Sequence, residues 1–580
     1  MIRRAHFALV ISIAILAMHI ACGSPAARPA PATATTIDQD LLDVTVPRLH
    51  RLYSDKKYTV TQVVKWHLDR IDRYNAVYGA IETLFRNDAL AEAARQDADA
   101  AKGAPQGPLF GVPIVIKANT SIKGYITTAG WEGFTRPGHE LIAPQDATIV
   151  SKFKQAGAII LGAANMPDLA NSDTNRSTSF GRTGNAYDVR FSPGGSSGGV
   201  VTAVAANFAV LGNGTDTGNS IRMPAATSAL VGVFPTRGLV SIAGIAPLDW
   251  LLDNTGPIAR TATDAAIALA VMAGADPLDP RTTEVPASAQ RPPYDARLSE
   301  GALKGKRFGV PAFVLAGEGV PFHGIPPGVN DPLFEKLRTA ASTPLKPVTR
   351  EMFMKAVEAL RKAGADVVID DSILPVGFAK AASHVATYAY MLDGTNRFLA
   401  TFGPAEYHSA AEYFKAVGSP LFKSSIGSEN DFHTFGNVHI DQRVIDTDPD
   451  VDRMYRTPKK AMMDAYLETL DRLKLDGYVY PAIQMPPPDE SMPQDGGLSG
   501  GPHSATSWIN MLGAPAIVVP AGFYPSGLPF GLEFAGRPWT DGDLLSIAYA
   551  WEQATHPRKP PTLVEKGLLP VTPAREPARR

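Results

Sequence analysis

The N-terminal third of the chain opens with apolar and polar positions that alternate with helical spacing. In residues 59–74, TVTQVVKWHLDRIDRY, apolar side chains recur at intervals of three and four, as on one face of an α-helix. Thr59 and Gln62 have the spacing of a capping box, in which each side chain accepts a hydrogen bond from the other residue's backbone N–H. An amphipathic helix beginning at Thr59 is therefore predicted to open the folded domain.

A second pattern, in residues 146–162 (DATIVSKFKQAGAIILG), changes its period partway along. Helical spacing ends near Gly157, and the apolar run AIIL that follows is typical of a buried strand. Later segments repeat these textures: strand, turn and strand over 233–244, a capped helix over 259–274, strands in 476–486 and 515–522, and a helix over 542–555. Helices that alternate with strands predict an α/β domain.

The composition and periodicity along the chain also predict its domain organisation. One large domain is expected over 41–563, with core regions at about 90–275 and 476–560. Between about 276 and 475, proline-rich pieces alternate with helical segments, and this region is expected to form a variable substrate lobe over the core. The Ala/Pro/Thr-rich residues 23–40 predict a flexible linker, and residues 564–580 a disordered tail.

The first 22 residues have the pattern of an export signal. Two arginines precede an apolar run over 7–18, which is too short to span a bilayer comfortably. Cys22, the only cysteine, stands where lipoprotein signals carry the residue that is lipidated, while His19 stands where leucine is usual, so ordinary cleavage nearby stays an alternative. The expectation is an exported protein, anchored by lipid at Cys22 and facing the periplasm, or otherwise periplasmic or secreted.

Composition excludes some functional classes. The 580 residues are 45% hydrophobic and 19% charged, as in an ordinary globular protein, and the formal net charge is −2. Lys and Arg are scattered, which argues against nucleic acid as a partner and against membrane contact other than the lipid anchor. The oligomeric state does not follow from the sequence.

The residues that could carry out a reaction lie in three segments: GPLFGVPIVIKANT (107–120), SPGGSSGGV (192–200) and GNGTDTGNSIRMPA (212–225). The second is not a phosphate-binding P-loop, because Val200 stands where that motif needs lysine followed by serine or threonine. It is also a poor linker, since the sequence that follows is apolar. Lys117 ends the apolar run VPIVIK, where it either reaches solvent or is buried with a lowered pKa.

Together and in this order, the three segments resemble the amidase signature family of serine amide hydrolases. The resemblance extends to FPTRGLVS, LDNTGPIARTATDAA and GLPFGLEFAGRPWTDGDLL, and it covers about 45–555, with 275–475 matching least. It implies a single α/β domain whose mixed, mostly parallel central sheet is flanked by helices. It also implies that the core over about 90–275 holds the signature.

The resemblance implies a triad of Lys117, Ser196 and Ser220. Neutral Lys117 would take the proton of Ser196, Ser196 would take that of Ser220, and Ser220 would attack the amide, because a serine hydroxyl needs a base to become a good nucleophile. Ser197 is expected to brace Lys117. The oxyanion hole is expected from backbone N–H groups of Thr217, Gly218, Asn219 and Ser220.

Two departures from the family pattern stand beside the triad. Asn219 replaces the commoner glycine, and Ala118 follows the lysine where aspartate is frequent. Asparagine tolerates left-handed backbone angles better than most residues, so the turn is expected to survive. Asp216 and Arg222 are interpreted as structural supports of the site rather than as groups that react.

The resulting hypothesis is an amidase that splits a carboxamide bond, other than a peptide bond, through an acyl-serine intermediate and without a cofactor. Its partner is a small-molecule amide. No metal site is expected, because no H-E-x-x-H or paired Cys/His spacing occurs, and His503 is interpreted as structural rather than as part of a pocket. Two alternatives stay open: a glutamine amidotransferase subunit, and a non-catalytic lipoprotein that binds amides or peptides on the same scaffold.

Overall fold

The computed structural model describes residues 36–317, 345–382, 385–407, 409–418, 434–435, 438–439, 442–490 and 504–561. The expected signal peptide with Cys22, the C-terminal tail over 564–580 and His503 lie outside the described residues. The first described helix, α1 (Thr36–Leu41), begins inside the segment 23–40 that was expected to be a linker. Residues 36–40 of that segment are therefore helical.

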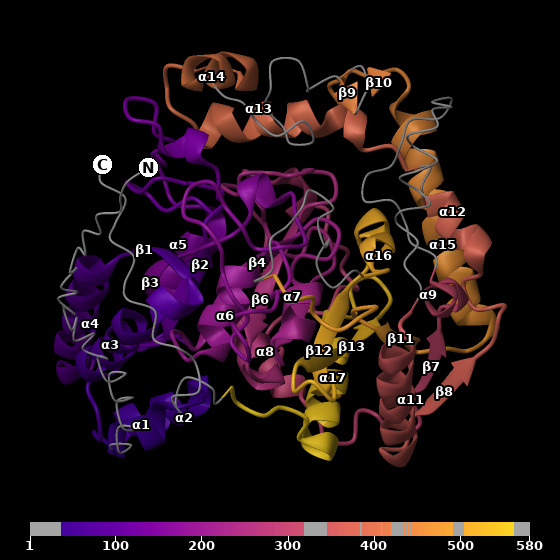
Figure 1. Ribbon diagram of the computed structural model, residues 1–580, viewed down its shortest axis with the longest axis horizontal. Helices are drawn as coiled ribbons and strands as arrows, with labels where there is room; N and C mark the ends of the chain where they lie inside the picture. Colours follow the sequence, from indigo (N-terminus) through magenta and orange to yellow (C-terminus); the bar gives the residue numbers. More distant parts are fainter. Residues whose placement is uncertain are drawn as a thin grey trace, which may run out of the picture.

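An eleven-stranded sheet runs through the described part of the molecule (Figure 1). Its order is β1-β3-β2-β4-β6-β5-β12-β13-β11-β7-β8. The strands are β1 (Ile81–Leu84), β2 (Pro113–Lys117), β3 (Ile159–Ala164), β4 (Leu211–Asp216), β5 (Val231–Phe234), β6 (Asn254–Ala259), β7 (Arg307–Val310), β8 (Asp366–Ile369), β11 (Gly477–Pro481), β12 (Ala516–Phe523) and β13 (Pro529–Ala535). A separate pair joins β9 (Thr434–Phe435) to β10 (Val438–His439).

The sheet is mixed, as expected, but it is not mostly parallel. Among the described strands, β2 pairs in parallel with β3 and β4, and β7 with β11 and β8. The other six neighbouring pairs are antiparallel. The centre of the sheet is antiparallel because β5, β6, β12 and β13 come in pairs joined along the chain without a crossover helix between them.

The helices that periodicity predicted are present. Helix α3 (Val60–Tyr78) begins after Thr59, whose capping box with Gln62 is formed. Helix α5 (Thr148–Gln155) leads into β3, and α8 (Ala262–Met272) and α17 (Asp541–Thr555) lie inside their predicted ranges or within one residue of them. The prediction fails over 233–244, where only β5 is a strand and Val240 makes an isolated bridge with Ala273.

The remaining described helices cover the two faces and the ends of the sheet. They are α2 (Val46–Ser54), α4 (Arg86–Ala101), α6 (Gly198–Ala205), α7 (Arg222–Thr227), α9 (Ala312–Ala316), α11 (Pro347–Lys362), α12 (Val376–Ala382), α13 (Met391–Phe402), α14 (Ala410–Val417), α15 (Thr457–Arg472) and α16 (Ser507–Leu512). Short 3₁₀ turns span Glu132–Thr135, Asp168–Ala170, Pro280–Thr282, Asp295–Arg297 and Tyr388–Tyr390, and a π-helical turn spans Asp452–Arg456.

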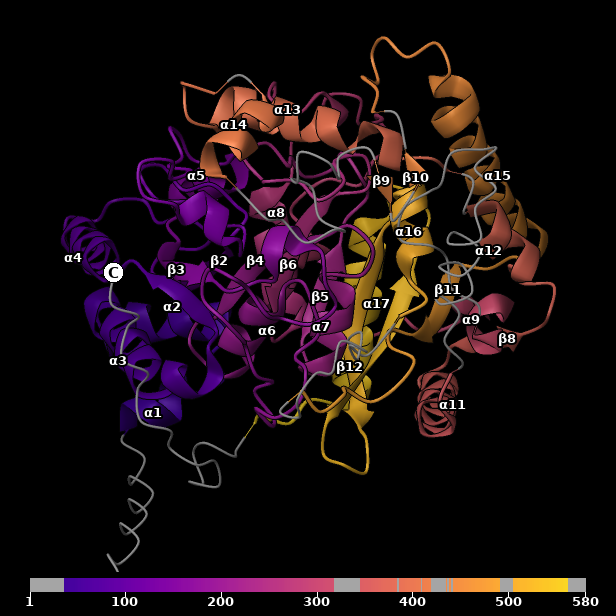
Figure 2. The ribbon, with the colours of Figure 1, turned by 45° about the horizontal axis from the view of Figure 1, so that its top comes forward.

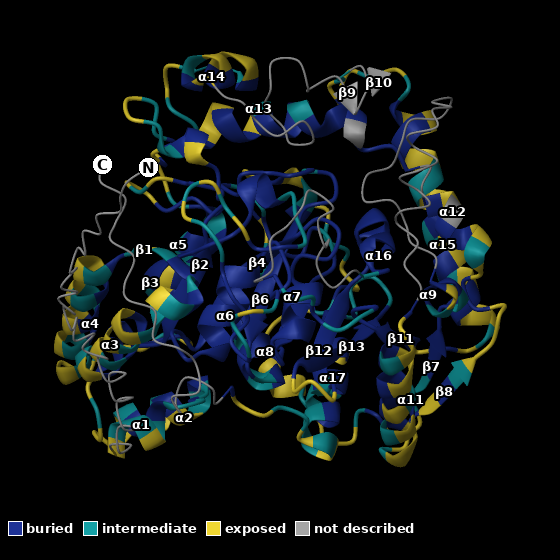
Figure 3. Cartoon of the chain, viewed as in Figure 1, coloured by how far each residue is buried: buried dark blue, intermediate teal, exposed yellow. Residues whose placement is uncertain are grey.

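Helices α6 and α7 are wholly buried, whereas α3, α4 and α11 expose their outer faces (Figure 3). Both helices are short, and every residue of each is buried. A helix without an exposed face is typical of an element enclosed by others, and it differs from an amphipathic surface helix. The segments before these two helices hold the predicted serines. The fold therefore places the candidate site in the interior.

The region 276–475 does more than cover the core. It supplies β7 and β8 to the same sheet, and α13 and α14 lie across the end of the molecule opposite α11 in both views (Figures 1 and 2). The α14 side packs on the core through aromatic rings: Trp131 lies 5.5 Å from Phe414 and Phe134 lies 5.6 Å from Tyr413, between ring centroids. The expected lobe is thus partly an extension of the sheet and partly a cover.

Candidate active site

Lys117 is the last residue of β2, and its side chain is fully buried. The run Pro113–Lys117 is apolar up to the lysine and pairs with β3 on one side and β4 on the other, so the whole strand lies inside. The Nζ atom lies 2.7 Å from Ser196 Oγ, 3.1 Å from Ser197 Oγ and 2.8 Å from Thr215 Oγ1. Three hydroxyl groups therefore surround the amine where water would otherwise be.

Burial lowers the pKa of Lys117 to about 7, from an ordinary value of about 10.4. Loss of hydration disfavours the charged ammonium, and the negative charges of Asp216 and Asp253 only partly offset this by raising the pKa. Near neutral pH a large fraction of Lys117 is therefore an uncharged amine with a lone pair. That is the form in which a lysine can accept a proton.

The glycine-rich segment brings Ser196 and Ser197 to this amine. Gly194 has φ +75°, which favours glycine, and the Gly195–Ser196 peptide bond is cis. A Cβ atom on Gly195 would lie 2.4 Å from the carbonyl oxygen of Ser172, so no larger residue fits there. Helix α6 starts directly after Ser197. The glycines thus allow a tightly packed turn that points both hydroxyl groups at Lys117.

Ser220 lies in the loop between β4 and α7, and it is 4% exposed. Its backbone carbonyl accepts a hydrogen bond of 3.2 Å from the N–H of Ser197. This bond joins the loop of Ser220 to the loop of Ser196 and Ser197. The structure therefore brings all three residues of the predicted triad into one buried region, with Lys117 bonded directly to Ser196.

Arg222 and Asp216 form the buried frame of the Ser220 loop. Arg222 donates to both carboxylate oxygens of Asp216, at 3.0 and 3.1 Å, and to Glu533 at 2.7 Å. It also donates to the carbonyl of Gly218 at 3.0 Å. Because that carbonyl is held by Arg222, the peptide groups of the loop have a fixed orientation, as preorganised backbone donors require.

The positive charge of Arg222 is paired with the carboxylates of Asp216 and Glu533. Burial lowers the pKa of Arg222, but the charges of Asp216 and Glu533 outweigh it and raise the pKa overall. Burial raises the pKa of Asp216, but Arg222 brings it below its ordinary value. Both groups are therefore ionised at neutral pH. Asn510 adds a further bond of 2.9 Å to the Asp216 carboxylate.

The other two residues of the predicted oxyanion loop are held by their side chains. Thr217 donates to Asp253 over 2.5 Å, and the Asn219 amide donates to Asp173 over 3.1 Å. Burial raises the pKa of Asp253 to about 6. Thr217, Gly218 and Asn219 are thus each tied to a different element of the surrounding structure, which leaves their loop little freedom.

Several residues of the site were not found from the sequence. Thr215, which contacts the Lys117 amine, also accepts a hydrogen bond of 3.1 Å from Asn119. Glu533 lies in the segment GLPFGLEFAGRPWTDGDLL, where the resemblance gave it no role, and Asn510 lies outside the segments that carry the resemblance. Thr215 could have been suspected, since strand alternation puts it on the same face of β4 as Asn213, which accepts a bond from the Lys117 N–H.

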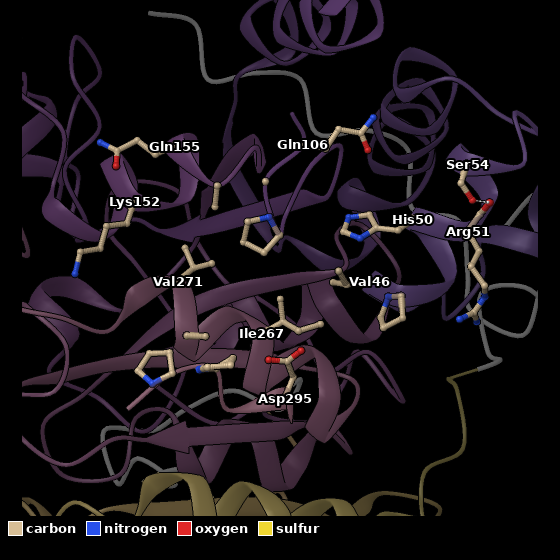
Figure 4. A pocket seen from close by; sticks show the side chains of 17 residues that line it. Val46, His50, Arg51, Ser54, Gln106, Lys152, Gln155, Ile267, Val271 and Asp295 are labelled. Atoms are coloured by element: carbon tan, nitrogen blue, oxygen red, sulfur yellow. Dashed lines mark hydrogen bonds between the residues drawn. The ribbon is translucent and has the colours of Figure 1, made fainter. Parts of the chain in front are cut away.

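A wide groove of about 1120 Å³ lies apart from these residues (Figure 4). It is lined by parts of α2, α5 and α8 and the loops beside them, including His50, Lys152 and Ile267. None of the predicted catalytic or supporting residues lines it. Lys152, one of the lining residues, donates hydrogen bonds to the carbonyls of Met272 and Ala273, both at 3.0 Å, at the end of α8.

In the described part of the chain, no cluster of three or more His, Cys, Asp or Glu residues has the arrangement of a metal site. The helices of the same described residues include none with the length and apolar character needed to cross a bilayer.

Comparison with known proteins places these features in a family. A family model described as Amidase matches residues 62–319 and 337–545. The chain is 31% identical to a glutamyl-tRNA(Gln) amidotransferase subunit of Alkaliphilus metalliredigens, over 88% of this chain and 96% of the relative. It is also 31% identical to the protein of that name from Moorella thermoacetica, over 90% of this chain and 99% of the relative.

Among solved structures, a native peptide amidase from Stenotrophomonas maltophilia is similar, with a TM-score of 0.71 and 28% identity. The similarity covers 89% of this chain and 98% of that one. The architecture expected for the family is thus present over nearly the whole chain. Since the family model matches most of its length and relatives exceed 30% identity, the chain belongs to the Amidase family, the amidase signature enzymes, which act on carbon–nitrogen bonds.

Proposed function

We propose that the protein hydrolyses the carbon–nitrogen bond of a small carboxamide other than a peptide bond, through an acyl intermediate on Ser220, and that Lys117 is the base. The observation that carries the proposal is the 2.7 Å contact between the buried Lys117 amine and Ser196. A lysine with its pKa lowered to about 7 can exchange protons with hydroxyl groups near neutral pH. No cofactor enters the reaction.

The proposed reaction runs as a relay. Lys117 takes the proton of Ser196, Ser196 takes that of Ser220, and the Ser220 oxygen bonds to the amide carbon, whose carbonyl oxygen becomes an oxyanion. Backbone N–H groups of residues 217–220 stabilise that charge. The carbon–nitrogen bond then breaks, and the leaving nitrogen receives a proton from Ser196, which regains one from Lys117.

Water completes the cycle by the same route. It gives a proton through Ser196 to Lys117, and its oxygen bonds to the acyl carbon. The bond between that carbon and the Ser220 oxygen then breaks, the carboxylic acid leaves, and Ser220 regains a proton from Lys117 through Ser196. The reaction releases ammonia from a primary amide or an amine from a substituted one. Arg222 takes no part in bond making; it holds the Gly218 carbonyl and so orients the N–H groups of the loop.

The hydrogen bonds around Lys117 support its role. A neutral amine has two N–H donors and one lone pair. Ser197 donates its own proton to the Thr215 carbonyl at 3.3 Å, and Thr215 Oγ1 accepts one bond from Asn119 and keeps a second lone pair, so both hydroxyl oxygens can accept from Lys117. The lone pair is then left for the proton of Ser196.

Covalent labelling tests the nucleophile. A fluorophosphonate probe is expected to form one adduct on Ser220, located by mass spectrometry, and Ser220→Ala is expected to lose both the adduct and amide hydrolysis. Ser54→Ala, at an exposed serine of α2, is the matched control and should label as the wild type does. Absence of an adduct on folded wild-type protein would refute the proposal and favour a non-catalytic amide-binding protein.

A second candidate is favoured by the named relatives, which are glutamyl-tRNA(Gln) amidotransferase subunits. We favour a hydrolase that works alone, because the first 22 residues have the pattern of an export signal, whereas charged transfer RNA is a cytoplasmic substrate. Glutamine belongs in the substrate panel. Release of ammonia from glutamine in preference to all other amides would reverse this choice.

We also propose export, with a lipid anchor at Cys22 that faces the periplasm. The support is the sequence pattern of residues 1–22. Expression of the full chain with radiolabelled palmitate is expected to label the wild type and not Cys22→Ser. Label that persists in the variant, or wild-type protein that stays unlabelled in the cytoplasm, would contradict the anchor.

A further inference from the structure

Asn219 stands where the family usually has glycine next to the nucleophile, and its side chain makes a hydrogen bond. Its amide donates to the carboxylate of Asp173 over 3.1 Å. Asn219 is 6% exposed and directly precedes Ser220. The departure therefore ties an acidic side chain to the residue beside the nucleophile.

Asp173 is held on its other side by the glycine-rich turn. A Cβ atom on Gly195 would lie 2.4 Å from the Ser172 carbonyl oxygen, 2.8 Å from the Asp173 carbonyl carbon and 3.0 Å from the Thr174 carbonyl oxygen. The backbone of 172–174 thus rests directly on the peptide that carries Ser196. Within these residues, the Ser172 hydroxyl accepts a bond of 3.1 Å from the Thr174 N–H, which gives the turn a defined shape.

These contacts place Asp173 between the two serine loops. Its backbone packs beside the Gly195–Ser196 peptide and its carboxylate accepts a hydrogen bond from Asn219, so the acid lies next to the residue that precedes Ser220. Asp173 itself is half-buried, whereas Asn219 and Ser220 are buried. Of these three residues, Asp173 is therefore the most accessible to a molecule that approaches from solvent.

A carboxylate in this place has an electrostatic consequence. The amide oxygen becomes negative in the transition state, and a fixed negative charge nearby raises the energy of that state for a neutral substrate. A positive charge on the substrate next to the scissile bond would reverse the effect, because it would be attracted by the same carboxylate. The acid thus discriminates between substrates by charge.

We propose that Asp173, oriented by Asn219, is a specificity residue that selects amides with a cationic group next to the scissile bond. The inference rests on the proposed amidase function and names the substrate class of that site. The cation can belong to the acyl part or to the leaving amine, and the same carboxylate would attract either. The experiment distinguishes the two.

Two pairs of amides of equal shape test the charge. On the acyl side, trimethylammonioacetamide is compared with 3,3-dimethylbutanamide; on the amine side, N-[2-(trimethylammonio)ethyl]acetamide is compared with N-(3,3-dimethylbutyl)acetamide. Each pair exchanges a cationic nitrogen for carbon. The value of kcat/KM is measured for all four with wild type, Asp173→Asn and the control Asp188→Asn, which removes a carboxylate paired with Arg190.

Asp173→Asn keeps an oxygen that accepts from Asn219, so the loop contact is retained while the charge is lost. We expect the ratio of cationic to neutral kcat/KM to fall about fivefold or more in one pair, which identifies the side of the cation, and to stay unchanged in Asp188→Asn. Ratios in both pairs that do not change between wild type and Asp173→Asn would overturn the proposal.

Failure of this inference is separable from failure of the amidase function. Each amide is also measured as a protector of Ser220 against the fluorophosphonate probe, so that a charge preference is read even from an amide that reacts slowly. If Ser220 is labelled, and the ratio of protection by the cationic and the neutral amide is the same in wild type and Asp173→Asn, only the specificity role is refuted. No labelling of the folded protein refutes the amidase function itself.

Discussion

The Nζ atom of Lys117 lies 2.7 Å from the Oγ atom of Ser196, and neither side chain is exposed to solvent. The two residues are 79 positions apart in the chain, one at the end of a strand and the other in a glycine-rich turn. Since burial makes the ammonium form of Lys117 unfavourable, this contact joins an amine that is partly neutral near pH 7 to the hydroxyl group of Ser196.

The first prediction concerns pH. Only neutral Lys117 accepts a proton, and its pKa is about 7, so kcat/KM for a neutral amide is expected to rise through pH 7 and to level off by about pH 9. An unperturbed lysine would give a rise near pH 10.4. A pH–rate profile with its half-maximum near that higher value would contradict the role of base.

The same lowered pKa has a consequence for stability. Between about pH 7 and 10.4 the unfolded chain binds a proton at Lys117 that the folded protein does not, so the free energy of unfolding rises with pH in this window. In Lys117→Met this contribution is absent. Urea denaturation at pH 7 and pH 10 is therefore expected to show a rise for the wild type relative to the variant, on the order of a few kcal/mol. Parallel changes in both proteins would contradict the buried titration.

Thr215 gives a prediction about the hydroxyl groups around the amine. Thr215→Val removes the oxygen that lies 2.8 Å from Lys117 and keeps the shape, so kcat is expected to fall about tenfold or more, since a well-placed base depends on its partners. Thr215→Ser keeps the oxygen and should recover most of that loss. If serine and valine variants were equally slow, the hydroxyl group would have no part in orienting Lys117.

How much of the site could be predicted depends on what each residue needs to be recognised. Lys117, Ser196 and Ser220 lie in short segments with a family resemblance, and the structure brings those segments together. Glu533 lies in a segment that shares the resemblance, but its role was not found, because it depends on a contact with Arg222 between β13 and α7 that local sequence does not reveal. The tie from Asn219 to Asp173 was missed for the same reason, although the unusual asparagine was noticed.

The fold, too, has features that local sequence predicts and features that depend on contacts between distant segments. Periodicity found α3 and its capping box, because both depend on neighbouring residues. It did not find the antiparallel centre of the sheet, since strand direction is decided by which strands pair, and β5 pairs with β12 from a segment nearly 300 residues away. The second strand predicted over 233–244 failed because Val240 finds only one bridging partner, Ala273.

The buried frame of the Ser220 loop gives a prediction about stability. In Arg222→Ala two carboxylates, Asp216 and Glu533, are left buried without their cation, so the free energy of unfolding should fall by about 3–5 kcal/mol. Lys355→Ala, which breaks an exposed pair with Glu351, is the control and should cost less than about 1 kcal/mol. Equal losses of unfolding free energy in the two variants, measured by urea denaturation, would show that the buried pairs of Arg222 stabilise the protein no more than an exposed pair does.

Asp253 joins the electrostatics of the site to the oxyanion loop, and this gives the last prediction. Its negative charge raises the pKa of Lys117, against the larger lowering by burial. Asp253→Asn keeps an oxygen that accepts from Thr217 but removes the charge, so the pKa of Lys117 should fall and the rise of kcat/KM should move to lower pH. Asp188→Asn, which removes the carboxylate paired with Arg190, is the control and should leave the midpoint in place. A midpoint that moved to higher pH in Asp253→Asn, or moved equally in both variants, would mean that the group that titrates is not Lys117.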